Sequence, residues 1–135
     1  MYQSYNLSHA DAQMMIAAIQ AKLEKEKKAA CVAVTDSHGE LIAFLRMDGC
    51  HLPPLYVAIN KAFTAARERR GSGEVGESVR KSGYPMTNFG DLRYTGWPGG
   101  FPVMHQGAVI GAIGVSGLTD EEDASLGRMA SGSVK

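Results

Sequence analysis

The sequence has no excess of either charge. Its 135 residues include 14 lysines and arginines against 14 aspartates and glutamates, so the formal net charge at pH 7 is +0. A protein that holds nucleic acid or an anionic lipid surface needs a field of positive charge that neutralises phosphates. We therefore expect no nucleic-acid partner. The hydrophobic content of 44% and the charged content of 21% are those of an ordinary globular domain.

Long apolar runs are also missing. No stretch approaches the roughly 20 residues that are needed to cross a bilayer. The first residues, Met1–Asn6, lack the charged and apolar regions of a signal peptide. These absences predict no membrane partner and a cytoplasmic location.

Cysteine is scarce. The two cysteines, Cys31 and Cys50, form no CxxC pair and match no zinc-binding spacing. We expect two buried or half-buried free thiols in a reducing compartment.

The sequence does contain an alternation of helical and strand patterns. Their order is helix, hairpin, helix, glycine-rich segment, hairpin, helix. The expected helices cover residues 9–28 and 55–70, with a short one around 77–81 and a last one from residue 120, and the expected strands cover residues 31–35, 40–47, 101–105 and 108–115. Because hairpins pair their strands antiparallel, the chain is predicted to be one α+β domain, residues 1–135, with helices covering an antiparallel sheet.

A run of small residues, Gly111–Gly117, lies in the last expected strand. Glycine in a strand marks a bulge or a close approach to the backbone. The spacing matches neither GxGxxG nor a P-loop, which excludes a nucleotide-phosphate site of those types. Alternation places Ala112, Gly114 and Ser116 on one smooth face. A covering helix, a neighbouring subunit or a flat ligand could occupy it.

Few residues suggest catalysis. Asp36 and Asp48 follow strands and could act as acids or bases, but such aspartates more often bond to their own turns. The acids of Asp120–Asp123 fit helix capping better than a metal cluster. Lys61 emerges from a small, apolar helix surface, where a desolvated lysine could hold a carboxylate or form a Schiff base. The alternative is a lysine that extends along its own helix toward water.

The histidines form no local metal pair, because none of the four lies three or four residues from another. His51 stands out because Met47 and Cys50 directly precede it. Histidine, cysteine and methionine are the axial ligand types of haem iron. Chance proximity is the alternative, and His105, at a strand end beside a turn, needs no functional explanation.

Five segments in sequence resemble the GlcG/HbpS-like family, which includes the C-terminal domain of PduO-type proteins. The segments are Val34–Gly39, Arg46–Gly49, Asn60–Ala65, Gly99–Pro102, and Gly111–Gly117 with Asp123. The resemblance implies profilin-like α/β/α layers around a five-stranded antiparallel sheet. It also implies a homo-oligomer and, in some members, haem binding, with genes in operons for glycolate, diol or glycerol metabolism.

The leading hypothesis is an oligomeric accessory protein that binds haem or another tetrapyrrole. The iron ligand would be His51 or His105, with Cys50 or Met47 as alternatives. The glycine-rich face would admit the macrocycle, and the remaining candidate cofactor-binding residues are Lys61, as a propionate partner, Thr64, Gly99 and Gly100.

Two other functions remain open. One is an enzyme that acts on a small hydroxy acid, diol or aldehyde, with Lys61 and Asp36 or Asp48 supplying the chemistry. The other is a structural partner of an operon-encoded metabolic enzyme. We expect no conventional enzyme and assign no catalytic residue.

Overall fold

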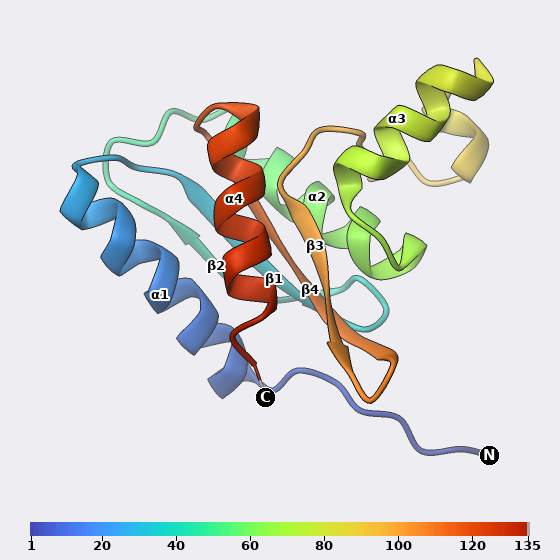
Figure 1. The fold of residues 1–135 in the computed structure, drawn as a ribbon, viewed down its shortest axis with the longest axis horizontal. Helices are drawn as coiled ribbons and strands as arrows, with labels where there is room; N and C mark the ends of the chain where they lie inside the picture. Colours follow the sequence, from blue (N-terminus) through green and yellow to red (C-terminus); the bar gives the residue numbers. More distant parts are fainter. Residues whose placement is uncertain (135) are drawn as a thin grey trace.

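A computed structural model describes residues 1–134 and shows an antiparallel sheet between layers of helices (Figure 1). The elements are α1 (His9–Glu26), β1 (Cys31–Asp36), β2 (Leu41–Arg46), α2 (Pro54–Glu68), α3 (Ser72–Ser82), the 3-10 helix η1 (Met86–Phe89), β3 (Gly100–His105), β4 (Ala108–Ser116) and α4 (Asp120–Ser131). The α+β class and the order of the predicted elements are confirmed. None of the helices within the described range has the length and apolar character needed to cross a membrane.

Helices α1 and α4 each begin with a capping box. Ser8 accepts a hydrogen bond from the backbone of Asp11, whose carboxylate accepts one from Ser8, and Thr119 and Glu122 do the same at α4. Each pair satisfies two N–H groups that a helix start otherwise leaves without partners. The acids at the start of α4 are thus first-turn residues, and no cluster of three potential metal ligands occurs among the described residues.

The sheet has the strand order β2-β1-β4-β3 with every pair antiparallel. The implied fifth strand is wrong for residues 1–134. The two hairpins supply four strands, and the segment between α2 and β3 forms helices and turns instead. Its glycines and prolines disfavour a paired strand.

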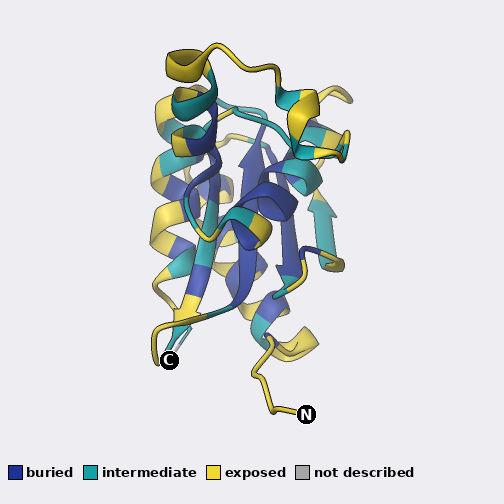
Figure 2. Cartoon of the chain, turned by 90° about the vertical axis from the view of Figure 1, so that its right-hand side faces the viewer, coloured by how far each residue is buried: buried dark blue, intermediate teal, exposed yellow. Residues whose placement is uncertain are grey.

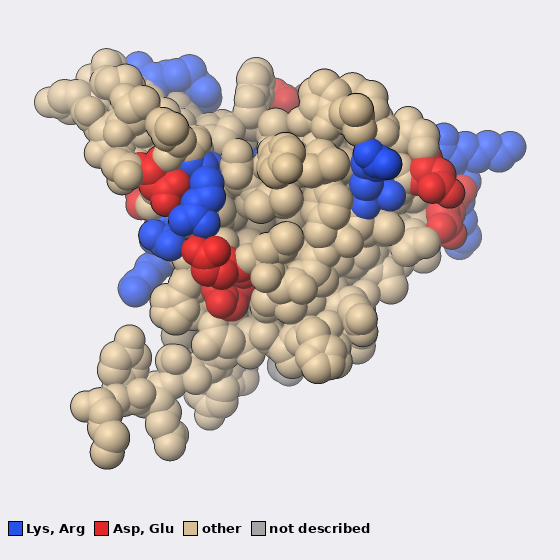
Figure 3. Space-filling view, turned by 180° about the vertical axis from the view of Figure 1, so that it is seen from behind, with Lys and Arg blue, Asp and Glu red and all other residues tan. Residues whose placement is uncertain are grey.

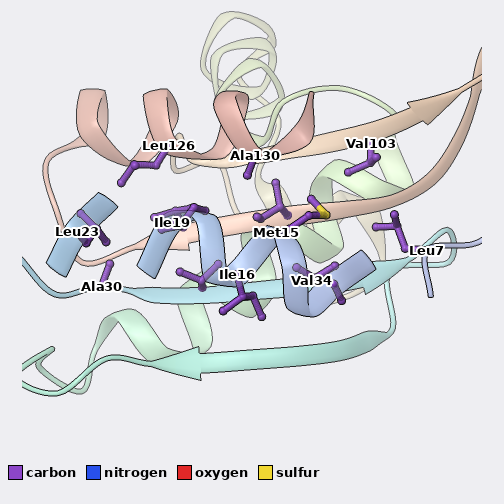
Figure 4. Packing of buried hydrophobic residues seen from close by; sticks show 14 of the residues in the cluster. Leu7, Met15, Ile16, Ile19, Leu23, Ala30, Val34, Val103, Leu126 and Ala130 are labelled. Carbon is purple, nitrogen blue, oxygen red and sulfur yellow. The ribbon is translucent and has the colours of Figure 1, made fainter. Parts of the chain in front are cut away.

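One face of the sheet packs against α1 and α4 through large apolar side chains (Figures 1 and 4). Met15, Ile19 and Leu23 of α1 point toward the strands, as the helical spacing predicts, and Leu126 of α4 joins them. These side chains form the main core. Figure 2 shows buried residues in the strands and on the inner sides of the helices.

The opposite face packs against α2 through much smaller side chains. Its cluster consists of Cys31 and the alanines 33, 58, 62, 65, 66 and 112. A Cβ atom at Gly114 would overlap the carbonyl oxygen of Ala58. At Gly114 the smooth face of the glycine run is therefore covered by a helix. Of the three occupants that the sequence allows there, a helix, a subunit or a flat ligand, the structure shows the helix. Helix and strand approach so closely because neither carries bulk at the crossing.

The region after α2 differs most from the prediction. The helix ends at Glu68, with Arg69 in the left-handed conformation at φ 59°, rather than at Gly71. The expected short helix becomes α3, an eleven-residue helix. It docks where a Cβ on Gly96 would lie 2.6 Å from the Cα of Gly76. Tertiary packing thus stabilises a helix that local propensity disfavours.

Candidate functional site

The 47–53 segment, between β2 and α2, brings three predicted ligands to one edge of the sheet. Met47, Cys50 and His51 all line a cavity of about 650 Å³. His51 and Gly117 also line a second cavity of about 240 Å³. The two cavities therefore adjoin at His51, whose side chain is exposed.

Local backbone geometry shapes this segment. The Cys50 N–H donates to the Met47 carbonyl over 3.1 Å, and Gly49 adopts a φ of +87° that other residues rarely reach. The chain then meets Pro53 and Pro54, which start α2. Because the turn closes at Cys50, the following residue, His51, lies at the cavity rim.

The two cysteines meet behind the larger cavity. The Sγ atoms of Cys31 and Cys50 lie 3.5 Å apart, and both thiols are free, as predicted. Cys31 is fully buried at the start of β1, whereas Cys50 is half-buried. Burial raises the pKa of the Cys31 thiol to about 12.

The cavity walls differ in character. The larger cavity is lined in part by Lys27, Lys28 and Arg46, and Lys28 forms an ion pair with Glu122. The smaller one is lined in part by proline, valine, leucine and tryptophan side chains: Pro53, Pro54, Val57, Leu118 and Trp97. The larger cavity therefore offers basic groups together with the acids Glu24 and Asp48, and the smaller one offers apolar surface together with Asp120 and Asp123.

Lys61 lines the smaller cavity but is already paired. Its ammonium donates to the Val115 carbonyl over 2.8 Å and to Asp123 Oδ2 over 3.1 Å, and the residue is only 2% exposed. The other oxygen of Asp123 accepts the Leu118 N–H. Burial lowers the pKa of Lys61, against the pull of the Asp123 carboxylate, and raises that of Asp123.

This pair revises the expectations for Lys61. The alternative prediction, in which the Lys61 side chain extends along its own helix toward water, is wrong, because the residue is buried. Pairing with a propionate stays a prediction, although such a group would compete with Asp123. The sequence places Asp123 at a helix start and among the residues of the family resemblance, but it does not pair Asp123 with Lys61. The signal for the pair is a lone lysine on an apolar helix face, which requires an acid when buried.

Thr64, Gly99 and Gly100 lie where α2 packs against β3 and the segment before it. The Thr64 hydroxyl donates to the Asn60 carbonyl and accepts the Thr95 N–H. A Cβ on Gly100 would overlap the carbonyl oxygen of Lys61. None of the three lines either cavity. Helix α2 covers the glycine-rich face at Gly114, whereas Ser116, at the end of the same face, lines the smaller cavity. A macrocycle against this face therefore stays a prediction, and only at the Ser116 end.

His105 lies at the opposite end of the molecule from His51. It ends β3 at the hairpin, where its ring centroid is 5.1 Å from that of Tyr5. The nine residues of β4 separate this end from Gly117, a span of roughly 27 Å. The structure therefore does not bring the two histidines together.

The aspartates of the enzyme hypothesis do not join Lys61 either. Asp36 accepts the N–H groups of His38 and Glu40 over 2.8 and 3.0 Å, so it orders its own turn, the alternative weighed for it. Asp48 lines the larger cavity, whereas Lys61 lines the smaller.

Comparison with known proteins agrees with this architecture. Escherichia coli K12 Protein GlcG is 38% identical over 110 residues, covering 82% of this chain and 81% of its own. A double mutant of Streptomyces reticuli HbpS superposes with a TM-score of 0.90 at 26% identity, covering 100% of this chain and 91% of its own. PduOC, solved as a heme complex, superposes with a TM-score of 0.87 at 23% identity and 96% coverage of both chains, which shows a shared fold.

The family pattern spans nearly the whole chain. The family described as "Haem degrading protein HbpS-like" matches residues 7–131, from the residue before the α1 cap to the end of α4. The chain therefore belongs to the HbpS-like family.

Proposed function

We propose that the protein binds haem at the two adjoining cavities, with His51 as the iron ligand. The observation that carries the proposal is the position of His51, exposed where the cavities meet, with Cys50 and Met47 in the larger of them. The description of the family and the heme complex of PduOC support the choice of ligand.

The residues at this edge fit the chemistry of haem. Imidazole, thiolate and thioether are all axial ligands of haem iron, and among the three candidate residues His51 is the most exposed. An iron porphyrin presents an apolar ring and two carboxylates. The apolar wall at Val57 and Leu118 suits the ring, and Lys27 and Arg46 suit the propionates.

Bound haem would supply iron-centred redox and ligand-binding chemistry. The chain's own part is to hold the ring at the rim and to donate a ligand. The imidazole of His51 would coordinate iron through a ring nitrogen.

Titration of the purified protein with hemin tests this assignment. We expect a shifted Soret band in the wild type and its loss, or at least a tenfold weaker affinity, in His51→Ala. His105→Ala is the matched control, since it removes a histidine from the far end of the sheet. An unchanged Soret band in His51→Ala would overturn the ligand assignment, and no Soret shift in the wild type would overturn haem binding.

Two further variants separate the alternative ligands. Cys50→Ser and Met47→Leu each remove one sulfur from the larger cavity while keeping its approximate volume. If His51 is the ligand, both variants retain the Soret position of the wild type. A shift in only one of them would reassign the iron to that sulfur.

We further propose that the protein acts as a homo-oligomer. Seen from behind, where α2 lies, the central surface carries few charges, and basic and acidic side chains lie beside one another at its margins (Figure 3). Leu52 and Tyr56 are 64% and 72% exposed. Exposed apolar side chains of this size are typical of a protein contact. An operon-encoded metabolic enzyme as partner stays a prediction.

A further inference from the structure

The strongest unassigned feature is the contact between the two thiols. Cys31 and Cys50 are 19 positions apart in sequence, yet their Sγ atoms lie 3.5 Å from each other. A disulfide needs an S–S distance of about 2.05 Å, so closing the bond requires a movement of about 1.5 Å. The two sulfurs are therefore near bonding range before any oxidation.

The surroundings of the two cysteines favour movement of only one of them. Cys31 is fully buried in β1, paired with both Arg46 of β2 and Ser116 of β4. Cys50 lies in the 47–53 segment, next to Gly49 with its positive φ. Gly117 makes room for the Cys50 sulfur, because a Cβ there would lie 3.2 Å from it. The mobile partner is thus Cys50.

Cys50 is also the more accessible of the two thiols. Cys50 lines the larger cavity and is half-buried, whereas Cys31 lies beneath it among the small residues facing α2. A small oxidant entering the cavity meets Cys50 first. The Cys31 sulfur, 3.5 Å away, is then within reach of an oxidised Cys50.

We propose that Cys31 and Cys50 form a peroxide-oxidisable pair that closes into an intramolecular disulfide. A hydroperoxide, ROOH, oxidises the Cys50 thiol to a sulfenic acid, and the O–O bond breaks to release ROH. The Cys31 sulfur then attacks the Cys50 sulfur, the S–O bond breaks, and water leaves with the thiol proton. The sum is two thiols and ROOH giving a disulfide, ROH and water.

The bond would tie the 47–53 segment to the buried end of β1. His51 directly follows Cys50, so oxidation restrains the residue that we assign to iron. That consequence rests on the proposed function, whereas formation of the disulfide does not. The two are therefore tested separately, and the disulfide is measured on haem-free protein.

The test uses purified, reduced, haem-free protein treated with hydrogen peroxide and then alkylated under denaturing conditions. We expect two alkylated cysteines before oxidation, none after it, and a peptide linking Cys31 to Cys50 that dithiothreitol releases. Closing the 19-position loop should also raise Tm. Cys31→Ala, which matches the alanine-rich surroundings, should leave Cys50 as a sulfenic acid that dimedone labels.

The Cys50→Ser variant and the oxidation products of the wild type test whether the intramolecular disulfide forms. Cys50→Ser should leave Cys31 unreacted. Wild-type protein whose thiols survive the oxidant, whose Cys50 retains the dimedone label, or whose cysteines link two chains would overturn the proposal, and this wild-type measurement stands even if a variant fails to fold. A missing Soret shift with an intact disulfide would overturn haem binding alone.

Discussion

A Cβ atom on Gly114 would overlap the carbonyl oxygen of Ala58 and lie 2.7 Å from the backbone nitrogen of Ala62. Gly114 lies two residues before the end of β4, paired with Ala33 of β1 and Gly100 of β3. The absence of a side chain here sets the distance between α2 and the sheet. Because α2 directly follows the 47–53 segment, this crossing also positions one end of the candidate site.

Gly114→Ala should therefore destabilise the fold strongly. The backbone atoms that the new methyl group meets cannot rotate away, so α2 must shift, at a cost of about 3 kcal/mol or more. Urea unfolding measures the change. Gly132→Ala is the control, because its Cβ would find ordinary contacts of 3.8 Å or more. Equal stability of the two variants would contradict this account of the crossing.

The sequence predicts what neighbouring residues determine. The cap of α1 needs only Ser8 and Asp11, and the candidate ligands follow one another within a single turn, so both are visible in one stretch of chain. The fold class and the alternating faces of β4 follow from hairpins and from the period of two in a strand.

Contacts between distant segments could not be predicted in this way. Lys61 and Asp123 are 62 positions apart, and each has an ordinary local role, in a helix or at a helix start. The meeting of Cys31 with Cys50 depends on how the 47–53 segment returns across the end of the sheet. The length of α3 depends on the contact between Gly76 and Gly96 rather than on helix propensity.

Lys61→Met should cost about 3–5 kcal/mol of stability, because it leaves the Asp123 carboxylate buried without its counter-charge. Adding Asp123→Asn should recover a substantial part of that loss, since the amide is neutral and its oxygen can still accept the Leu118 N–H. Denaturant unfolding of both single variants and the double variant gives the coupling energy. Additive losses would show that the two groups do not act as a pair.

Thr64→Val should lower the stability of the fold without changing the affinity for haem. The substitution keeps the shape of the side chain but removes the oxygen that accepts the Thr95 N–H over 2.9 Å. Leaving that donor without a partner costs about 1–3 kcal/mol. Hemin titration should give the wild-type Soret band and affinity. A selective loss of haem from stable protein would instead restore Thr64 to the cofactor site.

Asp11 should make α1 sensitive to acid. The backbone N–H of Ser8 and then its hydroxyl hold the pKa of the Asp11 carboxyl below 3.8. A carboxyl with a lowered pKa in the folded state stabilises the protein above its unfolded pKa, and this contribution disappears as the pH falls through the folded pKa. Asp11→Asn should therefore flatten the decline in stability below about pH 4. Parallel declines in variant and wild type would contradict this.

The exposed side of α2 supplies the last test. If the exposed side of α2 joins copies of the chain, light scattering coupled to size exclusion should give a multiple of 14.4 kDa. Tyr56→Asp should shift the protein toward the monomer, because a charge in an apolar contact loses its water. Tyr2→Asp adds the same charge at a residue 90% exposed, outside the helices and strands, and should change nothing. A monomeric wild type would remove the homo-oligomer from the proposed function and leave the cavity edge at His51 to bind haem within a single chain.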